Sequence, residues 1–391
     1  MDVFAAVMTG PGAAAIATIQ VYGQSAGTIL SKVFKPVGGQ PANFETSRIF
    51  LGHITDGPNT IDQVTIGCEA PQQFAIHCHG NPIIVQAIMA LLHDHGVQLC
   101  TAEQLRARML SAGEPQSAIA SEANLALATV RTLQGARIIT SQVNAGLSHL
   151  ATQWQQQIES MSLDNLAAQA RQVLEDSKPA RLIISGCSIV LIGPPNTGKS
   201  TLLNALAGRE KAIVTDIKGT TRDWISAEIH IPPLAATIID TAGLDLTAVH
   251  TDVAQAAQAR TLEMLHRADL ILLVLDITEP ATQLTDDLLA KLTGKEVLPV
   301  LNKTDLLPNL DPTQLPAHLG RPIPISATQP AGLEDLIGAI HRQLHVTNFN
   351  PQTPIALTTR QQDILHRLAT ATSHTAATPL ISELLEGPLS L

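Results

Sequence analysis

The chain has 391 residues, too many for one ordinary hydrophobic core, so we expect two or three domains. Its 24 Lys and Arg residues against 34 Asp and Glu residues give a formal net charge of −10, which argues against an avid, non-specific nucleic-acid binder. Because only 2% of the residues are aromatic, a protein that stacks bases on rows of exposed rings is also disfavoured.

The start of the chain and its cysteines favour a soluble, cytoplasmic protein with no membrane partner. Residues 1–12 lack the basic segment and apolar core of a secretory signal. The apolar run Leu270–Ile277 has the length of a strand, and no run approaches the length of a transmembrane helix. The four cysteines form no CxxC pair, which favours free thiols over a disulfide framework: Cys68, Cys78, Cys100 and Cys187.

Residues 1–103 are expected to form an N-terminal α/β domain. The apolar runs Ala14–Val21 and Asp62–Gly67 lie between Gly- and Pro-rich turns, and Pro82–His93 has the pattern of a helix. His77 and His79 would share one face of a strand, which leaves a zinc site open. Because no structural-zinc spacing accompanies them, we favour ordinary structural histidines.

Residues 104–182 and 347–391 are expected to form two parts of one α-helical domain. The first part has apolar residues at helical spacing: Leu125, Val130, Leu133, Leu147, Leu150, Trp154 and Ile158. The second part follows a linker at Asn348–Pro354 and has a helical pattern from Thr358 to Leu385. Its basic residues would contact RNA phosphates or form a solvated helix face, and the acidic total favours the solvated face: Arg360, His366, Arg367 and His374.

Residues 183–346 alternate between strand-like and helix-like segments. The strand-like runs are Ser188–Ile192, Thr237–Ile239, Leu270–Leu275, Val297–Leu301 and Ile323–Ile325. This alternation predicts a parallel sheet covered by helices on both faces. The expected fold is therefore an α/β domain inserted in an α-helical domain, with an N-terminal α/β domain before both.

A phosphate-binding motif follows the first of these strands. Residues Gly193 to Ser200 read GPPNTGKS, which fits GxxxxGK[ST]. The glycines allow backbone N–H groups to converge on phosphates, Lys199 supplies a positive charge, and Ser200 offers an oxygen to Mg²⁺. The next helix directs its positive N-terminal end at the same anion. The candidate binding residues are Asn196, Thr197, Gly198, Lys199, Ser200 and Thr201.

A second motif, DTAG, begins at the end of the next expected strand, about forty residues after the phosphate loop. There Asp240 would hold Mg²⁺ through water, and the N–H of Gly243 would face a γ-phosphate. Thr241 and Ala242 complete this part of the candidate site.

Two further motifs predict a guanine pocket. Residues Asn302, Lys303, Thr304 and Asp305 follow one strand, and Ser326 and Ala327 follow the next. The carboxylate of Asp305 can accept hydrogen bonds from both N1–H and N2–H of guanine, whereas adenine would leave it unpaired, a difference of roughly 10⁴-fold. Four motifs in order at strand ends predict a P-loop GTPase domain that binds GTP and GDP.

The segment from Thr215 to Asp223 reads TDIKGTTRD. Together with Asn196, it resembles the potassium-dependent GTPases related to translation factors, and most closely the MnmE (TrmE) family of tRNA modification GTPases. An N-terminal α/β module, a helical stretch containing Leu133-Gln-Gly135, an inserted GTPase domain and a helical tail extend the resemblance over nearly the whole chain.

The resemblance implies that Asn196 ligates K⁺ with the backbone carbonyls of Thr215 and Ile217. It further implies that Thr221 joins Ser200 on Mg²⁺, and that other residues of the segment line the nucleotide site: Asp216, Lys218, Gly219 and Thr220. Because Leu244 cannot orient water as a glutamine would, K⁺ would stabilise the transition-state charge. The implied assembly is a homodimer through the N-terminal and GTPase domains, with tRNA and a modification protein as partners.

The sequence departs from the family pattern at several positions. Ala254 stands where the family has its catalytic Glu, and the nearest acidic residue is Asp252, at a different spacing, so we expect slow hydrolysis. Gln20 replaces an arginine, the segment Cys68–Phe74 is too short, and Gly113 replaces a lysine, which argues against formyl-tetrahydrofolate binding. The residues up to Leu391 lack the family's terminal Cys-x-Gly-Lys, so a divergent member is expected.

The sequence therefore predicts a GTP-binding protein, a K⁺-assisted GTPase in tRNA wobble-uridine modification. Two alternatives stay open at this point. One is a degenerate GTP-dependent switch without modification activity, which the departures favour. The other is a ribosome-assembly GTPase, which would use the same kind of GTPase domain.

Overall fold

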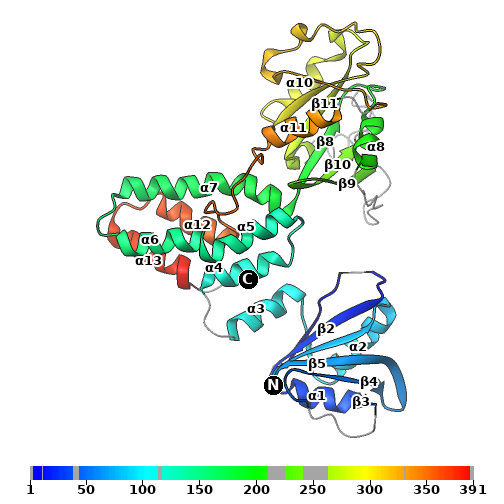
Figure 1. The fold of residues 1–391 in the computed structure, drawn as a ribbon, viewed down its shortest axis with the longest axis vertical. Helices are drawn as coiled ribbons and strands as arrows, with labels where there is room; N and C mark the ends of the chain where they lie inside the picture. Colours follow the sequence, from blue (N-terminus) through cyan, green and yellow to red (C-terminus); the bar gives the residue numbers. More distant parts are fainter. Residues whose placement is uncertain are drawn as a thin grey trace. The chain divides into compact units, whose positions relative to one another are not determined.

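The computed structural model describes residues 3–10, 12–37, 44–112, 117–209, 225–240, 263–329 and 332–387. The chain divides into two compact units, the first extending to Ser117 and the second beginning at Ala118 (Figure 1). Within the described ranges, no helix combines the length and the apolar character needed to cross a membrane. The boundaries of the four segments expected from the sequence stay predictions.

The first unit is built on a sheet with strand order β3-β4-β5-β6-β2-β1-β7 among the described residues. Helix α2 begins where the side chain of Asn81 accepts a hydrogen bond from the N–H of Ile83, with Pro82 in its first turn. The elements are β1 Phe4–Val7, β2 Ile16–Tyr22, α1 Ala26–Val33, β3 Phe34–Pro36, β4 Arg48–Asp56, β5 Asn59–Ala70, β6 Gln73–His79, α2 Pro82–Asp94, β7 Gln98–Leu99 and α3 Ala102–Ala112.

Helix α3 belongs to this first unit and packs on β1. Leu105 is fully buried against Phe4 and Ala6. The guanidinium of Arg108 lies 4.0 Å from the centre of the Phe4 ring, a cation–π contact. The pairing of β1 with β7 is parallel, while its pairing with β2 is antiparallel. The expected N-terminal α/β domain is confirmed.

The helical domain is assembled from both ends of the second unit (Figure 1). Its core combines side chains from before the GTPase domain, such as the fully buried Trp154, with side chains from after it, such as Leu365 and Leu384. This packing confirms that the GTPase domain is inserted in an α-helical domain. The helices are α4 Ala118–Leu127, α5 Leu133–Asn144, α6 Leu147–Gln157, α7 Leu163–Ser185, α12 Thr359–Leu368 and α13 His374–Glu386.

A buried ion pair joins the two halves of this domain. Nη2 of Arg360 lies 2.7 Å from Oε2 of Glu122, and both residues are less than a tenth exposed. Arg360 also donates to the carbonyl of Glu383, while Thr358 and Gln361 donate to Glu122. The sequence expectation for Arg360, an RNA contact or a solvated face, is therefore wrong, because its charge is neutralised inside the domain.

We expect Glu122→Gln to destabilise the helical domain by about 3–5 kcal/mol, because the Arg360 guanidinium would stay buried without its counter-charge. The measurement is urea unfolding followed by far-UV circular dichroism. Glu175→Gln is the matched control, since Glu175 pairs with Lys178 on an exposed face of α7 and should change stability by less than about 1 kcal/mol. Equal effects of the two substitutions would contradict the prediction.

The GTPase domain contains a sheet with strand order β13-β12-β11-β8-β10-β9. Its strands are β8 Cys187–Ile192, β9 Ile225–Ile231, β10 Leu234–Asp240, β11 Leu270–Asp276, β12 Val297–Asn302 and β13 Ile323–Pro324. Its helices include α8 Lys199–Arg209, α10 Asp286–Leu292 and α11 Leu333–Gln343, with short 3₁₀ turns η1 Ala281–Gln283, η2 Pro312–Gln314 and η3 Ala317–Leu319. Residues 263–267 are also helical.

The parallel sheet was predicted, but the sequence reasoning missed the edge strand β9. This strand pairs antiparallel with β10, whereas the other pairings in the sheet are parallel. Alternate residues of β9 are buried, including Ala227, Ile229 and Ile231, which is the period-2 pattern of a strand covered on one face. The central strand β11 is buried along its whole length, as expected between two layers of helices.

Both connections to the GTPase domain are held by specific contacts. Gly186 joins α7 to β8 with φ 85°, and a Cβ there would lie 2.7 Å from the carbonyl oxygen of Ala235. On the return path, the fully buried Gln142 donates to the carbonyl of Thr353 and accepts from the N–H of Ile355. Gly186 thus packs closely against the GTPase sheet, and Gln142 binds the returning segment to the helical domain.

Candidate functional site

The phosphate loop connects β8 to α8, and its two glycines occupy positions closed to other residues. Gly193 has φ 153°, and a Cβ there would lie 2.1 Å from the carbonyl oxygen of Val274. Gly198 has φ 91°, and a Cβ there would lie 2.3 Å from Nδ2 of Asn302. The loop therefore requires glycine at both positions for its backbone to approach the neighbouring strands.

Lys199, at the start of α8, is only 7% exposed. Its ammonium donates to the carbonyl oxygens of Gly193 at 2.9 Å and Pro194 at 2.8 Å, so the side chain folds back over the loop. Burial lowers the pKa of Lys199, and the nearby Asp240 carboxylate acts in the opposite direction. The arrangement places a desolvated cation at the positive end of a helix, where it can bind an anion strongly.

Ser200 and Asp240 meet beside this cation. Oγ of Ser200 donates to Oδ2 of Asp240 at 2.5 Å, and Asp240 is almost fully buried at the end of β10. Asp240 is brought there because β10 pairs in parallel with β8. A hydroxyl and a carboxylate are hard oxygen ligands, so the pair fits the chemistry of Mg²⁺.

Asn302 connects the phosphate loop to the candidate base pocket. Its Nδ2 donates to the carbonyl of Thr197 at 2.8 Å, and its Oδ1 accepts from the N–H of Ala327 at 2.9 Å. The side chain is 2% exposed, and both of its polar atoms are satisfied. Asn302 therefore fixes the spacing between two loops that are distant in sequence.

The remaining base-pocket residues lie around the end of β12. Oγ of Ser326 donates to Oδ1 of the exposed Asp305 at 2.6 Å, and this bond orients the carboxylate. The N–H of Thr304 donates to the carbonyl of Ile325. Lys303 has φ 65°, and its ammonium lies 2.5 Å from Oδ2 of Asp276. A carboxylate held in this way can accept two parallel N–H donors from a planar base.

The structure thus brings the described candidate residues together at the carboxyl ends of β8, β10 and β12, where ligands bind in open α/β sheets. They are Asn196, Thr197, Gly198, Lys199, Ser200, Thr201, Asp240, Asn302, Lys303, Thr304, Asp305, Ser326 and Ala327. The other candidates lie outside the described residues: 215–221, 241–243 and Asp252. Sequence reasoning missed Asp276, although its signal was present as an acidic residue that ends the otherwise apolar strand β11.

The singled-out residues of the N-terminal domain make ordinary contacts. Nε2 of Gln20 donates to Oε2 of Glu69 at 2.7 Å. A ring nitrogen of His77 lies 3.0 Å from Oγ1 of Thr18, and Nδ1 of His79 lies 2.7 Å from Oδ1 of Asp62. In the part of the chain that the structure describes, no group of three or more His, Cys, Asp and Glu side chains could hold a metal ion.

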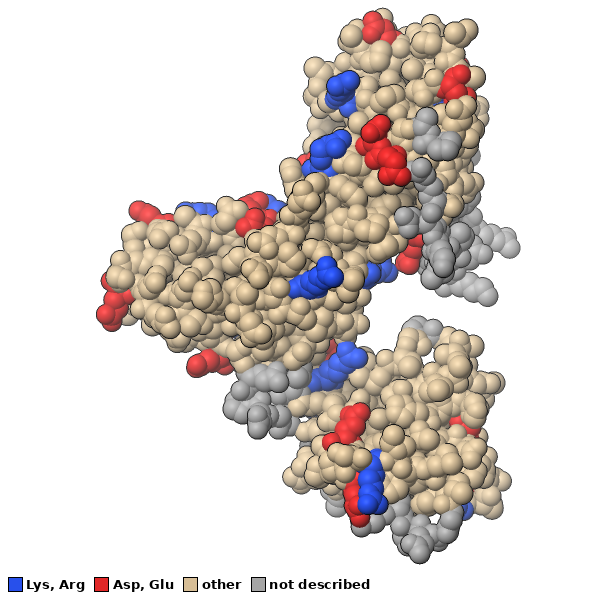
Figure 2. Space-filling view, viewed as in Figure 1, with Lys and Arg blue, Asp and Glu red and all other residues tan. Residues whose placement is uncertain are grey.

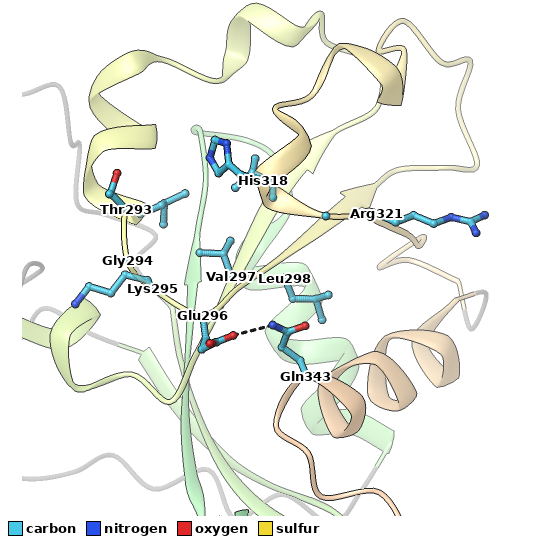
Figure 3. A pocket seen from close by; sticks show the side chains of 12 residues that line it. Thr293, Gly294, Lys295, Glu296, Val297, Leu298, His318, Arg321 and Gln343 are labelled. Carbon is cyan, nitrogen blue, oxygen red and sulfur yellow. Dashed lines mark hydrogen bonds between the residues drawn. The ribbon is translucent and has the colours of Figure 1, made fainter. Parts of the chain in front are cut away.

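A surface hollow of about 610 Å³ lies elsewhere in the GTPase domain, beside the amino end of β12. Within it Oε2 of Glu296 accepts a hydrogen bond from Nε2 of Gln343 (Figure 3). Lys295 and Arg321 extend from it in opposite directions, so their charges do not converge on one ligand (Figure 3). Because β12 carries the candidate base pocket at its other end, this hollow is separate from the candidate nucleotide site.

Two family models match the chain, one described as the N-terminus of the GTP-binding protein TrmE (residues 3–114) and one as a 50S ribosome-binding GTPase (residues 188–303). The tRNA modification GTPase MnmE of Bacillus subtilis is 32% identical over 379 residues, which covers 87% of this chain and 82% of the relative. MnmE of Alkaliphilus oremlandii is 28% identical over 405 residues, 94% of this chain and 87% of the relative. The solved G domain of the T. maritima FeoB iron transporter is 27% identical over 40% of this chain and 98% of that chain, with a TM-score of 0.33.

Proposed function

The chain belongs to the MnmE family of tRNA modification GTPases, and on this premise we propose how its GTPase site works. It is a GTP-binding protein that hydrolyses GTP. Neither a degenerate switch nor a ribosome-assembly GTPase is favoured, because the relatives that match most of the chain are tRNA modification GTPases. The proposal concerns the residues that bind the nucleotide and the cations that assist hydrolysis.

The observation that carries the proposal is the double hydrogen bond of Asn302. Because this side chain joins the phosphate loop at Thr197 to the base-pocket loop at Ala327, phosphates and base can be held at a fixed separation. In the proposed complex, Lys199 contacts the β- and γ-phosphates and Asp305 reads guanine N1–H and N2–H. Ser326 orients Asp305 for this contact.

Magnesium and potassium are the proposed cations. Ser200 and Thr221 would ligate Mg²⁺, and Asp240 would hold it through water. The bound Mg²⁺ would neutralise part of the phosphate charge. Asn196, in the left-handed region with φ 63°, is exposed at the loop and would ligate K⁺ with the carbonyls of Thr215 and Ile217. Such a cation would stabilise the charge that develops during hydrolysis, the part that an arginine has in other GTPases.

The test of the potassium proposal compares GTP turnover in KCl and NaCl at matched ionic strength. We expect turnover to be about 10²-fold faster in KCl, the effect of one preorganised positive group at the transition state. Asn196→Ala should remove the difference, whereas His318→Ala, in the separate hollow, should keep it. Equal rates in the two salts, with GTP bound in both, would refute the potassium role and leave GTP binding intact.

The proposed partners are tRNA, a modification protein and a second copy of the chain. On the face drawn in Figure 2, Lys and Arg side chains lie singly among uncharged residues, with Asp and Glu side chains between them. A tRNA bound on this face would therefore contact a few local cations, with a correspondingly shallow salt dependence. Formyl-tetrahydrofolate is not part of the proposal, since the Gln20 amide is already bonded to Glu69.

A further inference from the structure

We propose that Asp276 is a positioning residue that tethers the Lys303 ammonium, and so holds the lysine stem against the guanine base. The inference rests on the proposed assignment of the base pocket to residues around Asn302 and Asp305. Asp276 lies at the carboxyl end of β11, directly opposite Asn302 in the parallel pairing with β12. It is outside all four motifs that the sequence singles out.

The contact between the two side chains is a close ion pair. Nζ of Lys303 lies 2.5 Å from Oδ2 of Asp276, whose side chain is 6% exposed, whereas the lysine side chain is 32% exposed. The charged end of the lysine is therefore tethered to a buried carboxylate, while about a third of the lysine side chain stays exposed. An apolar stem with its charge anchored beneath presents a flat methylene surface on which a planar ring can pack.

Asp276 is itself held on every side, which makes it a fixed anchor. Its Oδ1 accepts from the N–H of Thr278 at 2.9 Å and from Oγ1 of Thr278 at 2.7 Å. Its backbone N–H donates to Oε1 of Gln283 at 2.9 Å, and its carbonyl accepts from Nε2 of the same residue at 2.9 Å. These bonds leave Oδ2 directed at Lys303. Groups locked by such neighbours position a binding residue more accurately than a free side chain would.

The charge state of the anchor is consistent with this role. Burial acts to raise the pKa of Asp276, but hydrogen bonds from Lys303 and Thr278 outweigh it and keep the pKa below its usual value. Asp276 is thus ionised throughout the physiological pH range. The ion pair already orders the Lys303 side chain before any nucleotide binds. Nucleotide binding therefore does not have to offset the side-chain entropy that this ordering costs.

The test uses the full chain, with the fluorescent nucleotide mant-GDP and inorganic tripolyphosphate as probes. In Asp276→Asn the amide can still accept from Thr278, but its NH₂ group would face the ammonium, so the tether is lost. We expect the Kd for mant-GDP to rise about 10- to 100-fold, the usual effect of losing a hydrogen bond to a charged group. The Kd for tripolyphosphate, which lacks a base, should change by less than about threefold.

A double-mutant cycle separates positioning from a general structural effect. If Asp276 acts through Lys303, the double variant Asp276→Asn with Lys303→Met should bind mant-GDP as weakly as Lys303→Met alone. Asp311→Asn is the matched control, because Asp311 is an exposed aspartate of the same domain that caps the turn η2, and it should leave both affinities unchanged. Asp276→Glu, whose longer side chain displaces the carboxylate, is the second variant if Asp276→Asn does not fold.

Three results would overturn the inference. The first is an unchanged affinity for mant-GDP in both Asp276 variants, and the second is a loss of tripolyphosphate affinity equal to the loss of mant-GDP affinity. The third is a double variant whose loss of mant-GDP affinity is the product of the losses in the two single variants. Failure of the wild-type chain to bind mant-GDP is a different result. It would overturn the proposed guanine site, and the inference with it.

Discussion

Lys199→Ala is expected to lower GTP turnover by about 10²- to 10³-fold, the range seen when one preorganised charge or donor is removed from a transition state. The lysine is buried at the start of α8, and its ammonium is directed over the phosphate loop by the carbonyls of Gly193 and Pro194. Lys199 is the single lysine of the loop from Gly193 to Ser200, so no other ammonium of this loop can take its place. The measurement is single-turnover phosphate release in KCl.

Lys295→Ala is the matched control for this prediction. It removes the same side chain from the same domain, but Lys295 lines the separate hollow and contacts His266. We expect wild-type turnover from the control and similar melting temperatures for both variants, because the Lys199 ammonium donates to carbonyl oxygens of its own loop. Turnover by Lys199→Ala within about fivefold of wild type, a difference of about 1 kcal/mol in barrier, would contradict the assignment of the phosphate site.

Asp305→Asn is expected to weaken GDP binding by about 10⁴-fold and to create a preference for xanthosine diphosphate. The carboxylate accepts from both N1–H and N2–H of guanine, whereas an asparagine amide offers one acceptor and one donor. Xanthine carries a carbonyl where guanine has its amino group, so it matches the amide and guanine does not. The bond from Ser326 to Oδ1 holds the side chain in the orientation that this selection requires.

Displacement of mant-labelled nucleotides by GDP, xanthosine diphosphate and ADP measures the change. Asp311→Asn is the control, since Asp311 is an exposed aspartate of the same domain that caps the turn η2. The control should bind GDP like the wild type. If the Asp305 variant loses affinity for GDP without gaining affinity for xanthosine diphosphate, the carboxylate stabilises the loop and does not hydrogen-bond to the base.

The sequence alone determined the chemistry of the phosphate end, because that chemistry depends on short spacings. The loop from Gly193 to Ser200 carries glycines where a Cβ would lie 2.1 Å from the carbonyl oxygen of Val274 and 2.3 Å from Nδ2 of Asn302. The spacing of these glycines and of the Lys and Ser that follow is contained within eight residues of sequence. The alternation of apolar runs and helical segments likewise predicted the α/β domain and its insertion, since strand and helix periods are local properties.

The tertiary structure decided which distant residues became partners. Arg360 pairs with Glu122 across 238 positions of the chain, Asn302 reaches Thr197 across 105, and Lys303 meets Asp276 across 27. Each pairing depends on how helices pack or on which strands are neighbours in the sheet, and local periodicity carries neither kind of information. For the same reason Arg360 was predicted as a surface residue: its own helix has solvated positions, and only the tertiary contact with Glu122 of α4 shows that its charge is buried.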